Sequence, residues 1–71
     1  MMQTFTAVIH KEEDMYVAEC PEVGTVSQGE NIEEAINNLK EATGLYLYEF
    51  PLKAERKTLM TTFEVAISVK A

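Results

Sequence analysis

The sequence predicts an α+β domain in which one helix packs on an antiparallel sheet, with the elements in the order β-β-β-α-β. Three observations support this fold class: short stretches rich in β-branched and aromatic residues near the start, a capped amphipathic segment in the middle, and a strictly alternating stretch near the end. The 71 residues make one small domain. Such domains bury only about 60% of their unfolded surface, so association with another chain is an expected source of stability.

The first half of the chain contains three predicted strands. Residues 4–10 form a first strand, and a short polar cluster joins it to a second strand at residues 15–19 as an antiparallel hairpin. Pro21 lacks the N–H that a sheet ladder requires and is expected to end the second strand. Residues 25–28 form a short third strand. Gly29 then marks a tight turn into the next element, where a positive φ is expected.

The middle of the chain predicts one helix that begins after Asn31. Asn31 is a good N-cap, and Glu34 follows three residues later, as in a capping box. The helix should run to Tyr48 or Glu49, because Phe50 precedes a proline and therefore avoids the α region. One apolar stripe recurs at helical spacing and should face the sheet; it consists of Ile32, Ala35, Ile36, Leu39, Ala42 and Tyr46.

The last turns of this helix are apolar on more than one side. Leu45, Leu47, Tyr48 and Phe50 fall outside the stripe that should pack on the sheet. Two interpretations remain open. Either the following Pro51-Leu52 segment covers these side chains, or they form a surface for self-association or for a partner protein.

Residues 61–69 predict a fourth strand. Apolar and polar or small side chains alternate there, as expected for a strand with one buried side. The apolar side carries Phe63, Val65, Ile67 and Val69. The single domain is therefore expected to span residues 1–71.

The charge of the chain is acidic and unevenly distributed. The formal net charge is −6; residues 1–49 hold two lysines against ten carboxylates, a charge of −8, whereas residues 50–71 carry +2. An acidic surface repels phosphate and argues against direct nucleic-acid binding, but it suits a basic protein partner. The alternative is that the charge only aids solubility. Glu12, Glu13 and Asp14 are candidate partner-binding residues.

The residue pattern does not predict an enzyme. Cys20 and His10 are each alone of their type, which excludes an internal disulfide and argues against a zinc site or a nucleophile-base pair. Glu19, Glu30 and Glu34 could serve a metal-dependent nuclease, but solvated acids and capping groups are the favoured interpretation. Three tyrosines, at positions 16, 46 and 48, could stack on bases, yet the acidic surroundings favour packing roles. No catalytic, cofactor-binding or metal-binding residue is expected.

The sequence also bears on location. It has no apolar run near the ~20 residues that span a membrane, and the first five residues, MMQTF, lack the features of a signal peptide. One free cysteine fits a reducing compartment. We therefore expect a cytoplasmic protein without a membrane partner.

Three ordered motifs resemble the HicB-like antitoxin family. They are YVAECPE at residues 16–22, SQGENIEEA at residues 27–35 and NLKEA at residues 38–42. The pattern is an aromatic strand that ends in proline, a Ser-x-Gly exit, a capped helix opened by Glu-Glu-Ala, and a later Glu-Ala. The resemblance covers about residues 4–50. Its structural signature consists of Tyr16, Pro21, Gly29, Asn31, Glu34 and Ala35.

The resemblance implies a partial ribonuclease H-like fold and a role in a type II toxin–antitoxin pair. HicB-like antitoxins cover HicA, a small basic ribonuclease that cleaves mRNA, and many carry a C-terminal DNA-binding segment. We expect one HicB-like domain over residues 1–71, no such segment, and hence no autorepression by this chain. Three hypotheses follow: an antitoxin that binds a HicA-like toxin, an orphan domain that forms a homodimer or higher homo-oligomer, and a degenerate metal-dependent nuclease.

Overall fold

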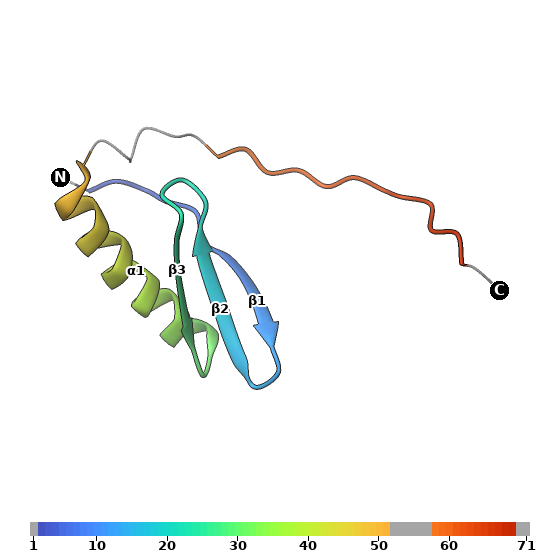
Figure 1. The fold of residues 1–71 in the computed structure, drawn as a ribbon, viewed down its shortest axis with the longest axis horizontal. Coiled ribbons are helices and arrows are strands. Elements are labelled where there is room, and N and C mark those ends of the chain that lie inside the picture. The colour runs from blue at the N-terminus through green and yellow to red at the C-terminus, as the bar shows by residue number, and fades with distance from the viewer. Residues whose placement is uncertain (1, 52–57, 70–71) are drawn as a thin grey trace.

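A computed structural model describes residues 2–51 and 58–69. Three antiparallel strands lie in the order β1-β2-β3, and one helix packs on the sheet (Figure 1). This arrangement confirms the predicted α+β class. The elements are β1 (Val8–Glu12), β2 (Met15–Cys20), β3 (Thr25–Gly29) and α1 (Ile32–Glu49).

The first strand begins and ends later in the sequence than predicted. β1 begins at Val8 rather than at residue 4 and includes Lys11 and Glu12, which pair with Tyr16 and Met15 of β2. The polar residues predicted as turn therefore extend the ladder, and a two-residue turn remains. Its first residue, Glu13, adopts a left-handed conformation with φ 54°, which a non-glycine residue adopts at a cost.

The second hairpin confirms the role expected for Pro21. β2 ends at Cys20, whose carbonyl accepts hydrogen bonds from the backbone N–H of Val23 at 3.3 Å and of Gly24 at 2.7 Å. Gly24 has a φ of +95°, which glycine adopts readily. β3 begins directly afterwards, at Thr25.

The predicted N-cap is present at the start of α1, but the return bond of the capping box goes to the residue before the cap. The Asn31 side chain accepts a hydrogen bond from Glu34 N at 2.7 Å, and the Glu34 carboxylate accepts one from Glu30 N at 2.8 Å. The Asn31 bond satisfies a donor that the helix leaves free, and the Glu34 bond holds the chain just before the helix. The helix ends as predicted: Phe50 N donates to the Tyr46 carbonyl at 2.8 Å, and Pro51 follows.

The buried core is small and lies between β2 and α1. Ala18 and Cys20 from the sheet meet Ala35 and Leu39 from the helix, and all four side chains are at most 5% exposed. Alanines at two of these positions bring the helix close to the sheet. Partly buried apolar side chains surround the core: Phe5, Ile9, Tyr16 and Val23.

Gly29 is required for a reason different from the expected one. Its φ is not positive; instead, a Cβ at this position would lie 2.5 Å from Ala35 N and 2.9 Å from the carbonyl carbon of Glu34. The strand and the first helical turn are therefore packed backbone to backbone. Only glycine permits this approach.

The buried stripe of α1 is rotated from the predicted one. Ile32 is 48% exposed, whereas Thr43, outside the predicted stripe, is 6% exposed. The Thr43 hydroxyl shares a 2.6 Å hydrogen bond with that of Thr25 on β3. A buried hydroxyl is tolerated because this bond satisfies it.

The fourth strand predicted at residues 61–69 is not formed. Residues 58–69, named here the tail, contain no strand and extend away from the sheet (Figure 1). Every side chain from residue 59 to residue 69 is exposed. An extended segment becomes a strand only when a neighbour accepts its backbone hydrogen bonds, and the tail has no such neighbour among the described residues.

Candidate protein-interaction surface

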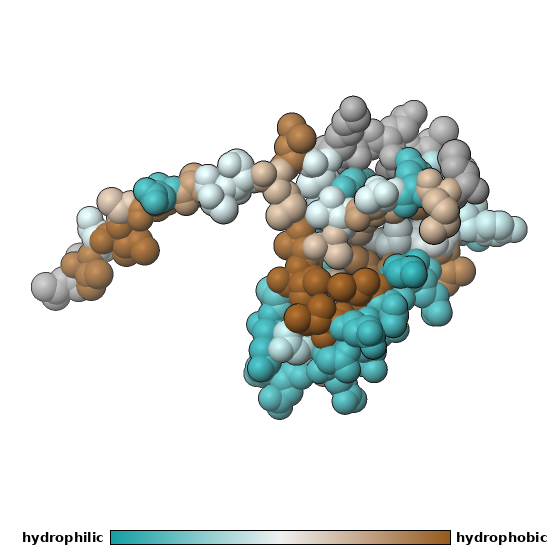
Figure 2. All heavy atoms as spheres, turned by 180° about the vertical axis from the view of Figure 1, so that it is seen from behind, coloured by the Kyte–Doolittle hydropathy of each residue, from teal (hydrophilic) through white to brown (hydrophobic). Residues whose placement is uncertain are grey.

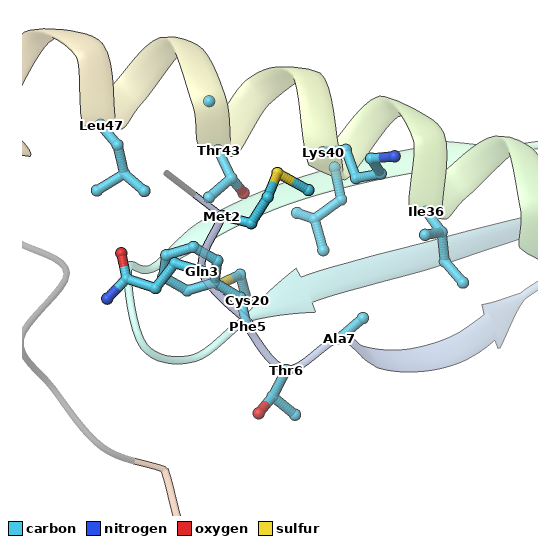
Figure 3. Close-up of a pocket in the computed structure, with 12 residues that line it drawn as sticks. Met2, Gln3, Phe5, Thr6, Ala7, Cys20, Ile36, Lys40, Thr43 and Leu47 are labelled. Atoms are coloured by element: carbon cyan, nitrogen blue, oxygen red, sulfur yellow. The ribbon is translucent and has the colours of Figure 1, made fainter.

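An apolar groove separates the segment before β1 from α1. It has a volume of about 510 Å³. Figure 3 shows Leu47, Thr43 and Ile36 extending from α1 toward this segment. The complete lining is Met2, Gln3, Phe5, Thr6, Ala7, Cys20, Ile36, Leu39, Lys40, Thr43, Gly44 and Leu47.

Glu22 attaches the N-terminal wall of the groove to the β2–β3 turn. Its carboxylate accepts hydrogen bonds from Thr6 N at 3.0 and 3.2 Å and from the Thr6 hydroxyl at 2.5 Å. Mainly because the Thr6 hydroxyl donates to the ionised form, the pKa of Glu22 falls from 4.5 to about 2. The ionised carboxylate therefore fixes the path of the chain leading into β1.

Cys20 and His10 do not form a catalytic pair. Cys20 is 1% exposed, and burial raises the pKa of its thiol, which donates a 3.4 Å hydrogen bond to Glu22. His10 lies opposite Val17 in the sheet and is exposed; its Nε2 is 2.9 Å from a Glu12 oxygen. Ala18 points into the core, so its neighbour Val17 points to the other face of the sheet. His10 pairs with Val17 and therefore lies on the face opposite the core.

The apolar end of α1 divides between the groove and the outer surface. Leu47 is half-buried and lines the groove. Leu45 is 65% exposed, Tyr48 85% and Phe50 51%. The Phe50 ring stacks against Tyr46 with centroids 4.9 Å apart, so this side chain is only partly covered. Three of the four predicted surface residues are thus accessible to a partner.

The acidic candidates lie at the opposite end of the molecule. Glu12, Glu13 and Asp14 are exposed around the β1–β2 turn. The register places Tyr16 of β2 beside Gly29 of β3, so this turn lies at the same end of the sheet as the start of α1. That end also carries Glu30, Glu33 and Glu34. The two predicted surfaces are therefore separate, one at each end of α1.

The nuclease alternative finds no shared site. Glu19 pairs with Val8 and Val26 near the far end of the sheet, whereas the Glu34 carboxylate accepts a hydrogen bond from Glu30 N at the start of α1. Among residues 2–51 and 58–69, no group of three or more His, Cys, Asp or Glu side chains is arranged to hold a metal ion. The fold places Glu19 at the opposite end of the sheet from Glu30 and Glu34.

The sheet face opposite α1 is not covered by another element in the described structure. The register aligns Val8, Glu19 and Val26 across the three strands, and Val26 is 55% exposed. Figure 2 shows a hydrophobic patch on the body surrounded by hydrophilic residues, and hydrophobic residues distributed along the tail. Apolar surface is thus exposed on both the body and the tail.

The groove and its Glu22–Thr6 link were not anticipated from the sequence. The two residues are 16 positions apart, and neither belongs to a motif that pairs them. No local pattern in the sequence therefore predicts the link.

One curated relative defines the family. A UPF0150 protein of Helicobacter pylori (strain J99) is 38% identical over 68 residues, which cover 87% of this chain and 94% of the relative. The chain belongs to the UPF0150 family. No family model matches this UPF0150 chain, and no solved structure matches it. The shared region is nearly the whole relative, so the sequence similarity extends well beyond one motif.

The signature residues of this UPF0150 chain have structural roles in the fold. Pro21 follows the end of β2, Gly29 contacts the helix backbone, and Asn31 with Glu34 caps α1. Lys11 Nζ lies 5.7 Å from the centre of the Tyr16 ring.

No helix in the described part of the chain is long and apolar enough to cross a membrane.

Proposed function

We propose that this UPF0150 chain is the antitoxin of a type II toxin–antitoxin pair, and that it binds and neutralises a HicA-like mRNA interferase in the cytoplasm. UPF0150 is a family of small proteins related to HicB-like antitoxins. The ordered signature that resembles HicB-like proteins supports the same role. Recognition is between proteins and involves no direct contact with nucleic acid.

The observation that carries the proposal is the gathering of carboxylates at one end of the fold. The β1–β2 turn and the start of α1 are far apart in sequence, but the sheet register places them together. Glu34 and Glu12 have partners there, Glu30 N and His10. All acidic side chains at this end are exposed: Glu12, Glu13, Asp14, Glu30, Glu33 and Glu34.

This acidic end suits a small basic ribonuclease. A ribonuclease that binds RNA needs a positive surface, and the same surface is attracted to carboxylates arranged on a rigid turn and helix start. Binding would cover the surface that RNA uses. Complementary charge mainly raises the association rate and the salt dependence of binding.

Co-expression with a HicA-like protein encoded in the adjacent reading frame tests the proposal. We expect a stable complex, relief of toxin-induced growth arrest, and loss of mRNA cleavage. Failure of every adjacent basic small protein to bind would refute the role.

A matched pair of variants tests the surface. The double change Glu13→Gln, Asp14→Asn should slow association about tenfold at low salt. A control that removes charge from exposed positions elsewhere on α1, Glu41→Gln with Glu49→Gln, should have little effect. Equal slowing in both would show that only net charge matters and that the acidic end is not the contact surface.

The exposed apolar residues favour a second candidate, an orphan homo-oligomeric domain. The relevant observation is that Leu45, Tyr48 and Phe50 are exposed and that the large side chains of the tail are exposed as well. Light scattering on the isolated chain tests it. A monomer throughout the micromolar range would contradict this candidate without affecting the antitoxin proposal.

A further inference from the structure

The tail has the composition of a strand and the exposure of an unfolded segment. The exposed fractions are 84% for Phe63, 66% for Val65, 83% for Ile67 and 86% for Val69. These side chains alternate with Glu64, Ala66 and Ser68. In the described part of residues 58–69, the one hydrogen bond joins the Thr61 hydroxyl to the Thr62 carbonyl. The backbone of a nine-residue apolar segment is therefore without partners.

The sheet has two edge strands, β1 and β3, and the β1 edge is the less covered of the two. On the β3 side, α1 packs closely against the strand, and Asn38 Nδ2 donates to the Gln28 carbonyl at 2.8 Å. The β1 side has no such cover in the described residues: the ladder of Val8–Glu12 uses only the edge that faces β2. An added strand would therefore find its backbone partners along β1.

The groove lies beside that open edge. One wall is the extended segment that leads into β1, and the other is α1. A strand added along β1 would place alternate side chains over this groove and the others on the open sheet face. The apolar side of the tail matches the apolar lining contributed by Phe5, Ile36 and Leu47.

The tail does not lie on its own sheet, and the surface that the chain leaves exposed is large enough for an interface with a second copy. The chain exposes 6399 Å², against about 4,500 Å² for a compact 8.0 kDa monomer. The excess of about 1,900 Å² exceeds the roughly 800 Å² that each partner buries in a standard interface. The radius of gyration, 15.2 Å, likewise exceeds the roughly 11 Å expected for 71 compact residues.

We propose that residues 61–69 of one copy form a strand on the β1 edge of a second copy, with the apolar side chains over the groove, in a reciprocal strand-exchanged homodimer. Each copy carries an uncovered β1 edge and one unpaired segment, so one two-fold arrangement pairs both β1 edges with both tails. This assembly does not depend on any toxin, and it leaves the acidic end of each body free.

Light scattering of the full chain provides the first test. From about 1 to 100 µM we expect a shift from the 8.0 kDa monomer toward a dimer of about 16 kDa. Ile67→Lys places a charge on the groove side and should weaken dimerisation about 100-fold. Ser68→Lys adds the same charge on the outer side and should change it less than about threefold. Far-UV circular dichroism should show an intact body in both variants, because the body does not contain the tail.

Isotope-filtered NMR on a mixture of labelled and unlabelled chains identifies the occupant of the edge. We expect intermolecular contacts between the methyl groups of Val65 and Ile67 and the side chains of Phe5 and Ile9. Purely intramolecular contacts would mean that the tail folds onto its own sheet, and contacts between tails alone would mean another interface. Either result overturns the proposal, as does a full chain that stays monomeric at about 100 µM or a dimer insensitive to Ile67→Lys.

Discussion

Two segments of this chain have the alternation of a strand, and only one of them is a strand. β2 pairs with β1 on one side and β3 on the other, and its Ala18 and Cys20 enter the core. The tail alternates at least as regularly but has no pairing partner in the described residues, and its apolar side chains are exposed. The difference shows that alternation specifies which side chains a strand would bury, whereas a neighbouring backbone decides whether the strand exists.

The largest expected effect tests the comparison directly. Leu39→Ala removes the largest apolar side chain of the buried core and should lower the free energy of unfolding by about 3 kcal/mol. Ile67→Ala, in the tail, should change it by less than about 0.5 kcal/mol when the chain is monomeric. Urea denaturation at about 1 µM, followed by circular dichroism, measures both. Similar losses in the two variants would show that the tail packs on its own body.

A pair of glycines sharpens the description of the body. Gly29→Ala forces a Cβ against the helix backbone and should cost about 2 kcal/mol or more. Gly44→Ala is the control: a Cβ there meets nothing within 4 Å, and the residue lies inside α1. Removing a helical glycine should therefore stabilise the fold by about 1 kcal/mol. Thermal unfolding of both variants gives the comparison, and a neutral Gly29→Ala would contradict the close packing of β3 against α1.

The Glu22–Thr6 link predicts a pH dependence of stability. The pKa of Glu22 is about 2 in the folded chain and about 4.5 in the unfolded one. Its contribution is therefore complete above pH 4.5 and is lost as the pH falls toward 2. Glu22→Gln should cost about 1 kcal/mol at pH 7, and the difference from the wild type should shrink in that acidic window. A difference that stays constant between pH 7 and 2.5 would mean that the carboxylate is not held as described.

The smallest expected effect concerns the β1–β2 turn. Glu13 has a positive φ that asparagine adopts more easily. Glu13→Asn should stabilise the body by about 0.5 kcal/mol. Asp14→Asn makes the same change of charge at a position without a positive φ, and it serves as the control in the same chemical denaturation series. Equal gains in both variants would assign the effect to charge rather than to backbone conformation.

The parts of the fold that sequence reasoning predicted correctly rest on local interactions. Asn31 and Glu34 are three residues apart, and their hydrogen bonds depend only on the conformation of one helical turn. Pro21 ends β2 because of its own ring, and Phe50 ends α1 because of the proline that follows. Such features can be inferred from neighbouring residues.

The parts that were wrong or missed depend on distant residues. Gly29 is required by the backbone of Glu34 and Ala35, and Thr43 is buried because Thr25 bonds to it from β3. The groove needs the N-terminal segment and α1 to face each other. The acidic and apolar candidate surfaces were predicted residue by residue, but their separation to opposite ends follows from the sheet register and the direction of the helix.

The tail and β2 show the difference between what local sequence patterns predict and what contacts between distant residues decide. The sequence by itself determined the fold class, the capped helix, the first three strands and the apolar side of residues 61–69, because periodicity and capping act within a few residues. Only the tertiary structure decided that three strands pair and the fourth does not, and that an open β1 edge and a groove lie together. Strand pairing depends on where another backbone lies in space, which a local pattern does not contain.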